Sequence, residues 1–143
     1  MKTTLFLLVL AAIPLTTDGA IYAATKAEEP VGGVKQSDAA AAKKLLDDAA
    51  AKKSAAITIL DIRTPEEFKN GHLAGAVNID FNGAKFAEEI AKLDKSTTYL
   101  VHCQSGGRST RSLPAFEKAG FKSLIHMHGG FAGWKKAGLP VEK

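Results

Sequence analysis

The sequence predicts an α/β protein with a central, mainly parallel β-sheet and helices on both faces. Two observations lead to this prediction. Short, apolar, β-rich runs alternate with segments in which apolar residues recur at helical spacing, and the connections between them are short. Such alternation indicates βαβ units, whose strands run parallel. The sequence shows no internal repeat, so we expect one layered domain and not a repeat array.

The composition is that of a single globular domain. The chain has 143 residues, of which 45% are hydrophobic and 24% are charged. These values exclude disordered, collagen-like and multi-span membrane proteins. The net charge of +4 comes from lysines spread along the chain, which indicates mild attraction of anions. A nucleic-acid partner is not expected, because nucleic-acid sites cluster their basic residues.

Residues 1–24 have the pattern of an export signal. Lys2 precedes an apolar run, Leu5–Ile13, and small residues follow up to Ala24. The run is too short to span a bilayer, so we expect cleavage between Ala20 and Ala24 and no stable membrane association. The predicted location is therefore outside the cytoplasm, in a bacterial periplasm. An uncleaved membrane anchor is the alternative.

The first elements of the domain follow from local signals. Residues 25–36 contain prolines, glycines and acidic residues, which favours a flexible lead-in, and the folded domain is expected over 37–143. Ser37 is placed to cap a helix through the alanine-rich stretch to about Lys53. Residues 56–60 form a short apolar run that reads as a buried strand ending at Asp61.

The middle of the domain continues the alternation. Residues 64–67 read Thr-Pro-Glu-Glu, a capping box with proline at the first helical position, so a short helix begins there and ends near Asn70. Residues 76–79 are expected to form a strand. A helix that ends before Asp94 is then predicted from four apolar residues at roughly helical spacing, Phe81, Phe86, Ile90 and Leu93.

The last elements repeat the pattern twice. Residues 97–102 are β-rich and apolar, and a helix is expected from Ser109 to Gly120. Pro114 lacks the N–H that would bond the carbonyl four residues earlier, so we expect a kink or a late start in this helix. A strand over residues 123–128 and a short helix around Trp134 complete the domain.

The single cysteine marks the candidate site. Cys103 follows a predicted buried strand, and Gly106, Gly107 and Arg108 lie between it and the next helix. In an open α/β sheet, ligands bind at this edge. We expect the backbone N–H groups of residues 104–108 and the helix N-terminus to form an anion-binding loop, which lowers the pKa of the thiol and makes it a nucleophile. The alternative is a buried core cysteine, which would need no such loop.

At these residues the sequence resembles the rhodanese-like, or sulfurtransferase, family. The resemblance covers about residues 37–143 and rests on four ordered blocks, namely Leu60–Phe68, Gly71–Ile79, Cys103–Ser109, and Gly129–Trp134 with Gly138–Val141. It implies the rhodanese-like fold. It also implies that Cys103 is the catalytic residue, accepts a sulfane sulfur as a persulfide and passes it on. The substrate-binding residues would be those of the loop, Gln104, Ser105, Gly106, Gly107, Arg108 and Ser109.

Loop length separates this family from its nearest competitor. Cysteine phosphatases resemble His-Cys-x5-Arg, whereas here only four residues lie between Cys103 and Arg108, and Ser109 stands where a phosphatase arginine would be. The shorter loop favours a terminal sulfur atom over a phosphate group. A cysteine phosphatase and a persulfide carrier or binding module without catalysis remain as alternatives.

The resemblance also defines the expected partners. These are a small anionic sulfur donor such as thiosulfate and an external acceptor, cyanide or a thiol. The acceptor must be external because the chain has no second cysteine to resolve the persulfide. We expect no cofactor and no metal, and the sequence leaves the oligomeric state open.

Other polar and aromatic residues are expected to support the fold. Asp61 and Arg63 are predicted to form a structural ion pair that ties the strand end to its neighbours, and His72 is predicted to be structural. Trp134 is expected to pack in the core. His126 and His128 lie two apart on a predicted strand and so share a face, which leaves a metal site with a third ligand as a less favoured possibility.

Overall fold

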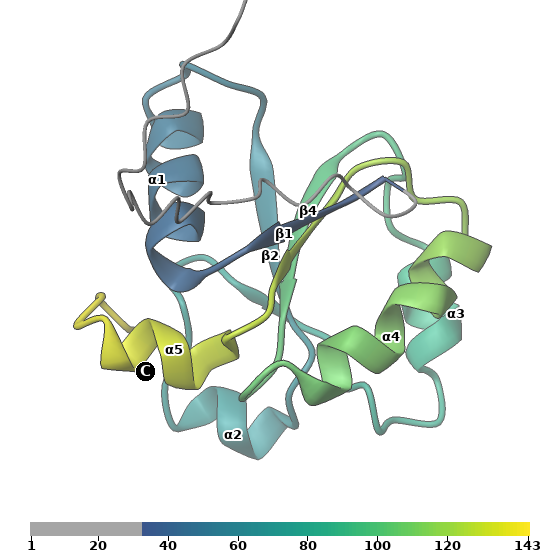
Figure 1. Cartoon of the computed structure of the whole chain (residues 1–143). Coiled ribbons are helices and arrows are strands. Elements are labelled where there is room, and N and C mark those ends of the chain that lie inside the picture. The colour runs from purple at the N-terminus through teal and green to yellow at the C-terminus, as the bar shows by residue number, and fades with distance from the viewer. Residues whose placement is uncertain (1–32) are drawn as a thin grey trace, which may run out of the picture.

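Five parallel strands form the central sheet of the computed structural model, which describes residues 33–143. The strand order is β1-β5-β4-β2-β3, with helices on both faces (Figure 1). This arrangement confirms the predicted α/β class. The elements are β1 Val34–Ser37, α1 Ala39–Ala50, β2 Ile57–Asp61, α2 Pro65–Lys69, β3 Val77–Asn78, α3 Phe86–Ala91, β4 Thr98–His102, α4 Gly107–Lys118, β5 Leu124–Met127 and α5 Gly130–Lys136.

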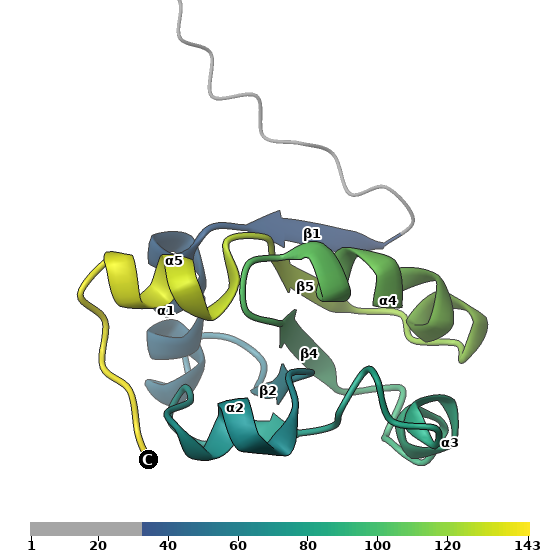
Figure 2. The same ribbon diagram turned by 90° about the horizontal axis from the view of Figure 1, so that it is seen from below.

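The helices cover the sheet in two separate layers. Helices α1 and α5 lie against one face and α3 and α4 against the other, as the end-on view in Figure 2 shows. Within β4, the side chain of Leu100 packs with α1 and α5, while Tyr99 and Val101 pack with α3 and α4. This alternation follows from the two-residue period of a strand. Because both faces are covered, the central strands are apolar over most of their length.

Strand β4 is the centre of the sheet and leads directly to Cys103. It pairs with β2 on one side and with β5 on the other. Four of its five residues are buried. All strands run the same way, so their C-terminal ends meet at one edge, where α2 also lies (Figure 1). The cysteine therefore emerges at the edge where open α/β sheets bind ligands.

The N-terminal part of the domain differs from the prediction at two points. Residues 34–36, expected to belong to a flexible lead-in, form most of β1, which pairs with β5 from Val34 to Ser37. The pairing partner is distant in sequence, so local composition could not reveal this strand. Asp38, and not Ser37, caps α1, since its side chain accepts the N–H of Ala41. The predicted signal, residues 1–24, lies outside the described residues.

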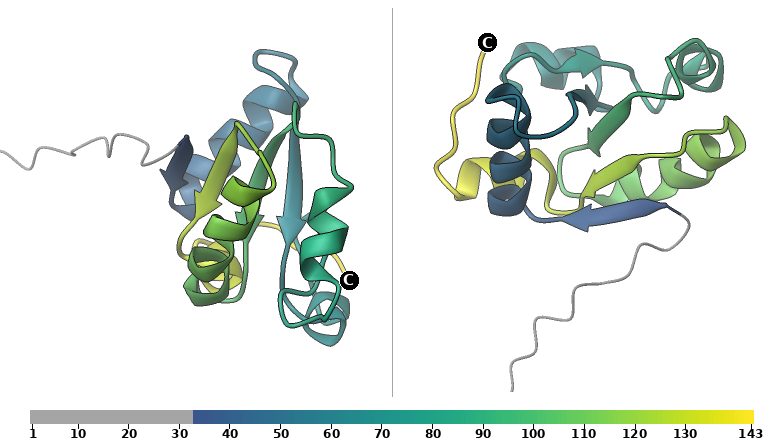
Figure 3. Two further views of the ribbon diagram at one scale, coloured as in Figure 1. Left: turned by 90° about the vertical axis from the view of Figure 1, so that its right-hand side faces the viewer. Right: turned by 90° about the horizontal axis from the view of Figure 1, so that it is seen from above.

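Two helices, α3 and α4, begin at other residues than expected. The predicted helix through Phe81 and Leu93 is reduced to α3, Phe86–Ala91, and Phe81 lies in the loop before it, where its ring contacts Phe86 edge to face. Helix α4 begins at Gly107, two residues earlier than predicted, and contains Pro114 without ending there. The expected late start is therefore wrong. Figure 3 shows α3 and α4 side by side on their face of the sheet.

The capping box of α2 is confirmed. The Thr64 side chain accepts the N–H of Glu67, and the Glu67 carboxylate accepts the N–H of Thr64. This reciprocal pair satisfies two N–H groups that the first turn of a helix leaves free. None of the five residues of α2 is buried. The capping box therefore fixes where this short helix begins.

A buried ion pair fastens the C-terminal end of β2. The Arg63 guanidinium is 2% exposed and donates to the Asp61 carboxylate, with Nη2 at 2.6 Å from Oδ2, and to the carbonyl of Gly71 at 2.8 Å. It also lies over the Phe131 ring, 4.0 Å from the ring centroid. Charges buried this deeply persist only when paired. The pair ties β2 to the loop after α2 and to α5, which is the structural role expected of both residues.

His72 and Trp134 also occupy structural positions. The His72 ring stacks on Phe68 at 3.8 Å between centroids, and its backbone exchanges hydrogen bonds with Glu142. Trp134 is 3% exposed and donates from Nε1 to the carbonyl of Pro140. These contacts attach the C-terminal residues to the domain.

Among the helices of residues 33–143, none has the length and apolar character needed to cross a bilayer.

Candidate active site

The Cys103 sulfur is buried and enclosed by the loop that follows β4. The residue is 1% exposed and its thiol is free. The sulfur accepts the N–H of Gly106 at 3.2 Å and the N–H of Ser109 at 3.4 Å, and the Ser109 hydroxyl lies 3.5 Å away. Of the two backbone donors, Gly106 belongs to the expected range 104–108, and Ser109 lies one residue beyond it. The loop and the first turn of α4 together surround the sulfur with hydrogen-bond donors.

These contacts control the ionisation of the thiol. Burial alone raises the pKa of Cys103, but hydrogen bonds from the Ser109 hydroxyl and from the N–H groups of Ser109, Ser105 and Gly106 more than offset it. The net result is a thiol pKa below its ordinary value. Donors that point at a sulfur anion stabilise the thiolate over the thiol. The site therefore favours a nucleophilic sulfur, as the sequence predicted.

Two glycines allow the close packing around the cysteine loop. Gly106 has φ +102°, and a Cβ built on it would lie 2.0 Å from the His128 carbonyl oxygen. Gly130 has φ +57°, and its Cβ would lie 2.6 Å from the Cys103 carbonyl oxygen. The same Cys103 carbonyl accepts the N–H of Phe131 at 2.8 Å. Backbone thus packs directly on backbone, and the start of α5 fixes the loop.

Neighbouring glycines should respond oppositely to alanine. We expect Gly106→Ala to lower the free energy of unfolding by at least about 1–2 kcal/mol, because a side chain disfavours positive φ and the His128 carbonyl must move. Gly107→Ala is the matched control, since a Cβ there meets no atom within 4 Å. It should leave stability unchanged or raise it by up to about 1 kcal/mol. Urea unfolding measures both, and equal effects would contradict the packing described for Gly106.

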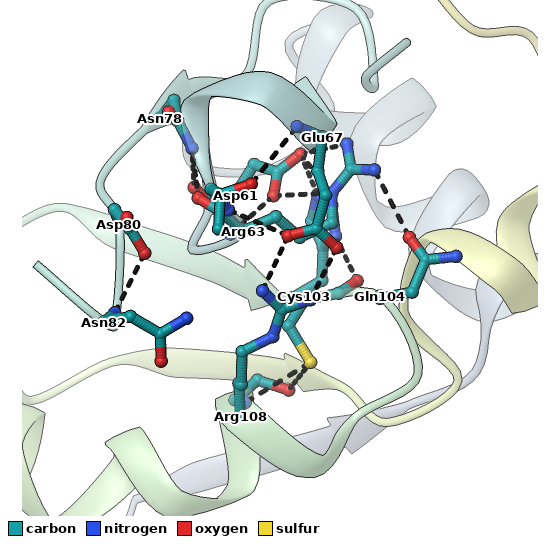
Figure 4. A network of polar contacts seen from close by, with 12 residues as sticks. Asp61, Arg63, Glu67, Asn78, Asp80, Asn82, Cys103, Gln104 and Arg108 are labelled. Atoms are coloured by element: carbon teal, nitrogen blue, oxygen red, sulfur yellow. Dashed lines mark hydrogen bonds and ion pairs between the residues drawn. The ribbon is translucent and has the colours of Figure 1, made fainter. Parts of the chain in front are cut away.

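Arg108 is paired with Glu67 of α2. Its Nη1 and Nη2 each donate to the Glu67 carboxylate at 2.7 Å, and Figure 4 shows this pair beside the Cys103 sulfur. The Arg108 bonds are the main cause that lowers the pKa of Glu67 to about 2. The same contact raises the pKa of Arg108. The charge of Arg108, one of the predicted substrate-binding residues, is therefore partly neutralised by Glu67, which the sequence presented only as a capping residue.

The Glu67 contact should make stability depend on pH in acid. The pKa of Glu67 is lowered from 4.5 to about 2 in the folded protein, so its stabilisation is complete above about pH 5 and is lost as the pH falls toward 2. We expect the free energies of unfolding of the wild type and Glu67→Gln to differ most near neutral pH and to converge near pH 2. Urea unfolding at several pH values measures the difference. A constant difference would contradict a charged pair.

Three further residues of the loop lie at the surface. Gln104, Ser105 and Gly107 are exposed. The Gln104 side chain accepts a hydrogen bond from Arg63 Nη1 at 3.4 Å, and the Gln104 carbonyl accepts the N–H of Ala132 at 2.8 Å. Gln104 and Ser105 thus lie at the surface of the loop that follows Cys103.

Ser109 connects the site to residues that the sequence did not assign to it. The Ser109 hydroxyl lies 2.8 Å from His126 Nε2, and His126 Nδ1 lies 2.8 Å from Gln36 Oε1. Both ring nitrogens of His126 are thus engaged, while His128 is exposed. In residues 33–143, no three His, Cys, Asp or Glu side chains gather as metal ligands would. No pattern in the sequence predicts this cluster, because Ser109, His126 and Gln36 come from three separate elements, α4, β5 and β1.

A second hollow lies on the opposite side of the sheet. Its volume is about 520 Å³, and it is formed by α1, β2, the residues that follow His72 and the C-terminal part of the domain. Its lining includes Leu46, Ile57 and Trp134 but none of the residues predicted for the site. The chemistry of the loop is therefore separate from this apolar hollow.

Known proteins resemble this chain in sequence and in structure. The model of the rhodanese-like domain matches residues 38–137. Thiosulfate sulfurtransferase 16, chloroplastic, of Arabidopsis thaliana is 39% identical over 93 residues, which cover 58% of this chain and 78% of that protein. The probable adenylyltransferase/sulfurtransferase MoeZ of Mycobacterium tuberculosis is 34% identical over 84 residues, 59% of this chain but 21% of MoeZ.

Solved structures share the same architecture. The crystal structure of a rhodanese-related protein from Thermoplasma volcanium has a TM-score of 0.62 at 27% identity and covers 75% of this chain and 96% of that one. The crystal structure of the Alr3790 protein from Anabaena sp. also has a TM-score of 0.62 at 27% identity, over 74% of this chain and 81% of that one. The fold predicted from the resemblance is confirmed.

Proposed function

Since this chain belongs to the rhodanese-like domain family, we propose that it is a sulfurtransferase that carries a sulfane sulfur on Cys103. One observation supports this more than any other. The Cys103 sulfur lies at the C-terminal edge of the sheet and accepts the N–H groups of Gly106 and Ser109. An anionic sulfur is the species that such donors stabilise.

The proposed reaction has two steps. The Cys103 thiolate attacks the outer sulfur of thiosulfate, a new S–S bond forms, and the S–S bond of the donor breaks so that its electron pair leaves with sulfite. The product is a persulfide anion on Cys103. A nucleophile such as cyanide or a thiol then attacks the terminal sulfur, and the Cys103 thiolate leaves. Because the chain has one cysteine, no internal thiol competes with the external acceptor.

Thiosulfate is the proposed donor on two grounds. One relative is a thiosulfate sulfurtransferase by name, and it is 39% identical to this chain. The loop also holds four residues between Cys103 and Arg108, a ring small enough to suit a single terminal sulfur atom. The donor's own sulfonate oxygens would face Gln104 and Ser105, the exposed loop residues.

Mass spectrometry and a paired assay test the proposal. Thiosulfate should add the mass of one sulfur atom to the pure protein, and addition of cyanide should remove it with formation of thiocyanate over many turnovers. An unchanged mass with several sulfane donors would overturn the sulfurtransferase. A persulfide formed with little turnover would indicate a carrier module instead, and hydrolysis of an aryl phosphate would indicate a phosphatase.

We also propose that the protein is exported to a bacterial periplasm through residues 1–24. The support is the short apolar run Leu5–Ile13 after Lys2, which has the length of a signal and not of a membrane span. Expression of the full chain in a bacterium, followed by fractionation, tests this. The mature protein should begin between Ile21 and Thr25 in the periplasmic fraction, whereas an intact chain in the cytoplasm would contradict it.

A further inference from the structure

A line of polar side chains runs from the Cys103 sulfur to the far edge of the sheet. The Ser109 hydroxyl lies 3.5 Å from the sulfur and 2.8 Å from His126 Nε2, and His126 Nδ1 lies 2.8 Å from Gln36 Oε1. Ser109 is 0% exposed, and His126 is 2% exposed. Polar groups buried this deeply are usually placed to meet one another. The line therefore links three strands and α4 in a single path.

Strand pairing places the two outer residues of this line. Gln36 of β1 lies opposite His126 of β5, and His126 lies opposite Val101 of β4. Directly paired residues point to the same face, and Val101 points toward α4, so His126 does as well. A shift of β1 by one residue would turn Gln36 to the other face. The register of β1 is thus what brings an amide to His126.

The hydrogen bonds set the direction in which protons can move. The Ser109 hydroxyl donates to the Gly106 carbonyl at 3.0 Å, and that carbonyl also accepts the N–H and the hydroxyl of Thr110, each at 2.9 Å. Because the two Thr110 donors use both lone pairs of the carbonyl, the Ser109 hydroxyl can turn its proton to His126 when the thiol donates to Ser109 Oγ. Gln36 Oε1 accepts the Nδ1–H of His126, which leaves Nε2 as the acceptor.

We propose that His126, held by Gln36, takes up the Cys103 thiol proton through the Ser109 hydroxyl. In this step the thiol gives its proton to Ser109 Oγ while the Ser109 hydroxyl gives its own proton to His126 Nε2. The products are a Cys103 thiolate and a His126 imidazolium, and no bond other than those to hydrogen changes. This inference rests on the proposed function, in which the Cys103 thiolate attacks a sulfur donor. His126 acts through Ser109 and is a positioning residue.

The burial of the sulfur explains why such a path is needed. Cys103 is 1% exposed, so its proton has little direct access to solvent. Gln36 is half-buried on the edge strand. Burial lowers the pKa of His126, and the exposed His128 beside it lowers that pKa further, so the ring is neutral and able to accept a proton. The other residues of the line, Ser109 on α4 and Gln36 on β1, are uncharged. The charged group that acts on the Cys103 sulfur is Arg108 of α4, which is paired with Glu67.

Titration of the thiol tests the relay without any sulfur donor. The thiolate is followed by its ultraviolet absorbance against pH, and Cys103→Ala is the blank because the chain has one cysteine. We expect His126→Asn to raise the thiol pKa and to lower the thiolate fraction at neutral pH about tenfold, a shift of about one unit. His128→Asn is the matched control, two residues away and outside the line. It removes a group that lowers the pKa of His126, so it should leave the thiol pKa unchanged or lower it, and should not raise it.

A second variant, Gln36→Glu, distinguishes the relay from a direct effect of charge on the thiol, because the two predict opposite shifts of the thiol pKa. Gln36→Glu places a carboxylate on His126 Nδ1, which strengthens the base, so the relay predicts a lower thiol pKa. A carboxylate that acted only through space would raise it. An unchanged titration in folded His126→Asn, or a raised pKa in Gln36→Glu, overturns the relay. If His126→Asn fails to fold, the sign of the Gln36→Glu shift alone decides.

These results are separable from the proposed function. Suppose that the thiol pKa rises in His126→Asn and falls in Gln36→Glu, but that thiosulfate forms no persulfide. This result would support the relay and contradict the sulfurtransferase. Persulfide formation in the wild type, with an unchanged thiol titration in His126→Asn, would support the sulfurtransferase and contradict the relay. Where both hold, His126→Asn should also move the pH profile of persulfide formation to higher pH, and His128→Asn should not.

Discussion

Replacement of Cys103 by serine is expected to abolish sulfur transfer while the protein stays folded. The sulfur is the only thiol of the chain and the atom to which the donor sulfur would bond. Serine keeps an acceptor for the N–H groups of Gly106 and Ser109, so the loop retains its hydrogen bonds. A hydroxyl is not ionised at neutral pH and cannot form a persulfide. Turnover with thiosulfate and cyanide should fall by at least about a thousandfold.

Two measurements keep this experiment specific. Thermal unfolding of Cys103→Ser should stay close to that of the wild type, and mass spectrometry should find no added sulfur after thiosulfate treatment. Retained turnover in folded Cys103→Ser would exclude this residue as the sulfur carrier.

Asp61→Asn should cause the largest loss of stability. The change leaves the Arg63 guanidinium, 2% exposed, without the carboxylate that it contacts through Nε and Nη2. The side-chain oxygen of asparagine can still accept the backbone N–H of Arg63. The main loss is therefore the negative charge of Asp61. Removing one partner of a buried pair costs about 3–5 kcal/mol. Urea unfolding should show a correspondingly lower midpoint.

A double variant separates the unpaired charge from the shape of the site. Asp61→Asn with Arg63→Met removes both charges and keeps an apolar stem beside the Phe131 ring, on which Arg63 now lies. Buried pairs replaced by apolar residues often cost little. The double variant should therefore be more stable than Asp61→Asn alone. If both are equally destabilised, the lost interaction is the hydrogen bonding and not the charge.

Local patterns predicted the features that depend on local physics. The Thr64–Glu67 capping box needs only four consecutive residues, and the structure forms it as expected. The alternation of apolar runs and helical spacing predicted the parallel sheet, and the glycines after Cys103 predicted a loop with N–H donors at the sulfur. Each of these is decided within a short stretch of chain.

The features that were missed depend on partners distant in sequence. Arg108 and Glu67 are 41 residues apart, and His126 and Gln36 are 90 apart. Strand β1 has no strong pattern of its own and forms because β5 offers it an edge. The metal possibility for His126 came from treating it with His128 alone, whereas register turns its ring toward Ser109. Only the assembled sheet brings these groups together.

The position of β4 has a consequence for motion. As a buried strand between two paired neighbours, it should hold the amide hydrogens that exchange most slowly with solvent, through global unfolding alone. Helix α2, with no buried residue, should exchange through local fluctuations. Cys103 follows β4 directly, whereas the Glu67 carboxylate that pairs with Arg108 stands on α2. The backbone at the sulfur should therefore stay fixed while the Glu67–Arg108 pair moves with α2.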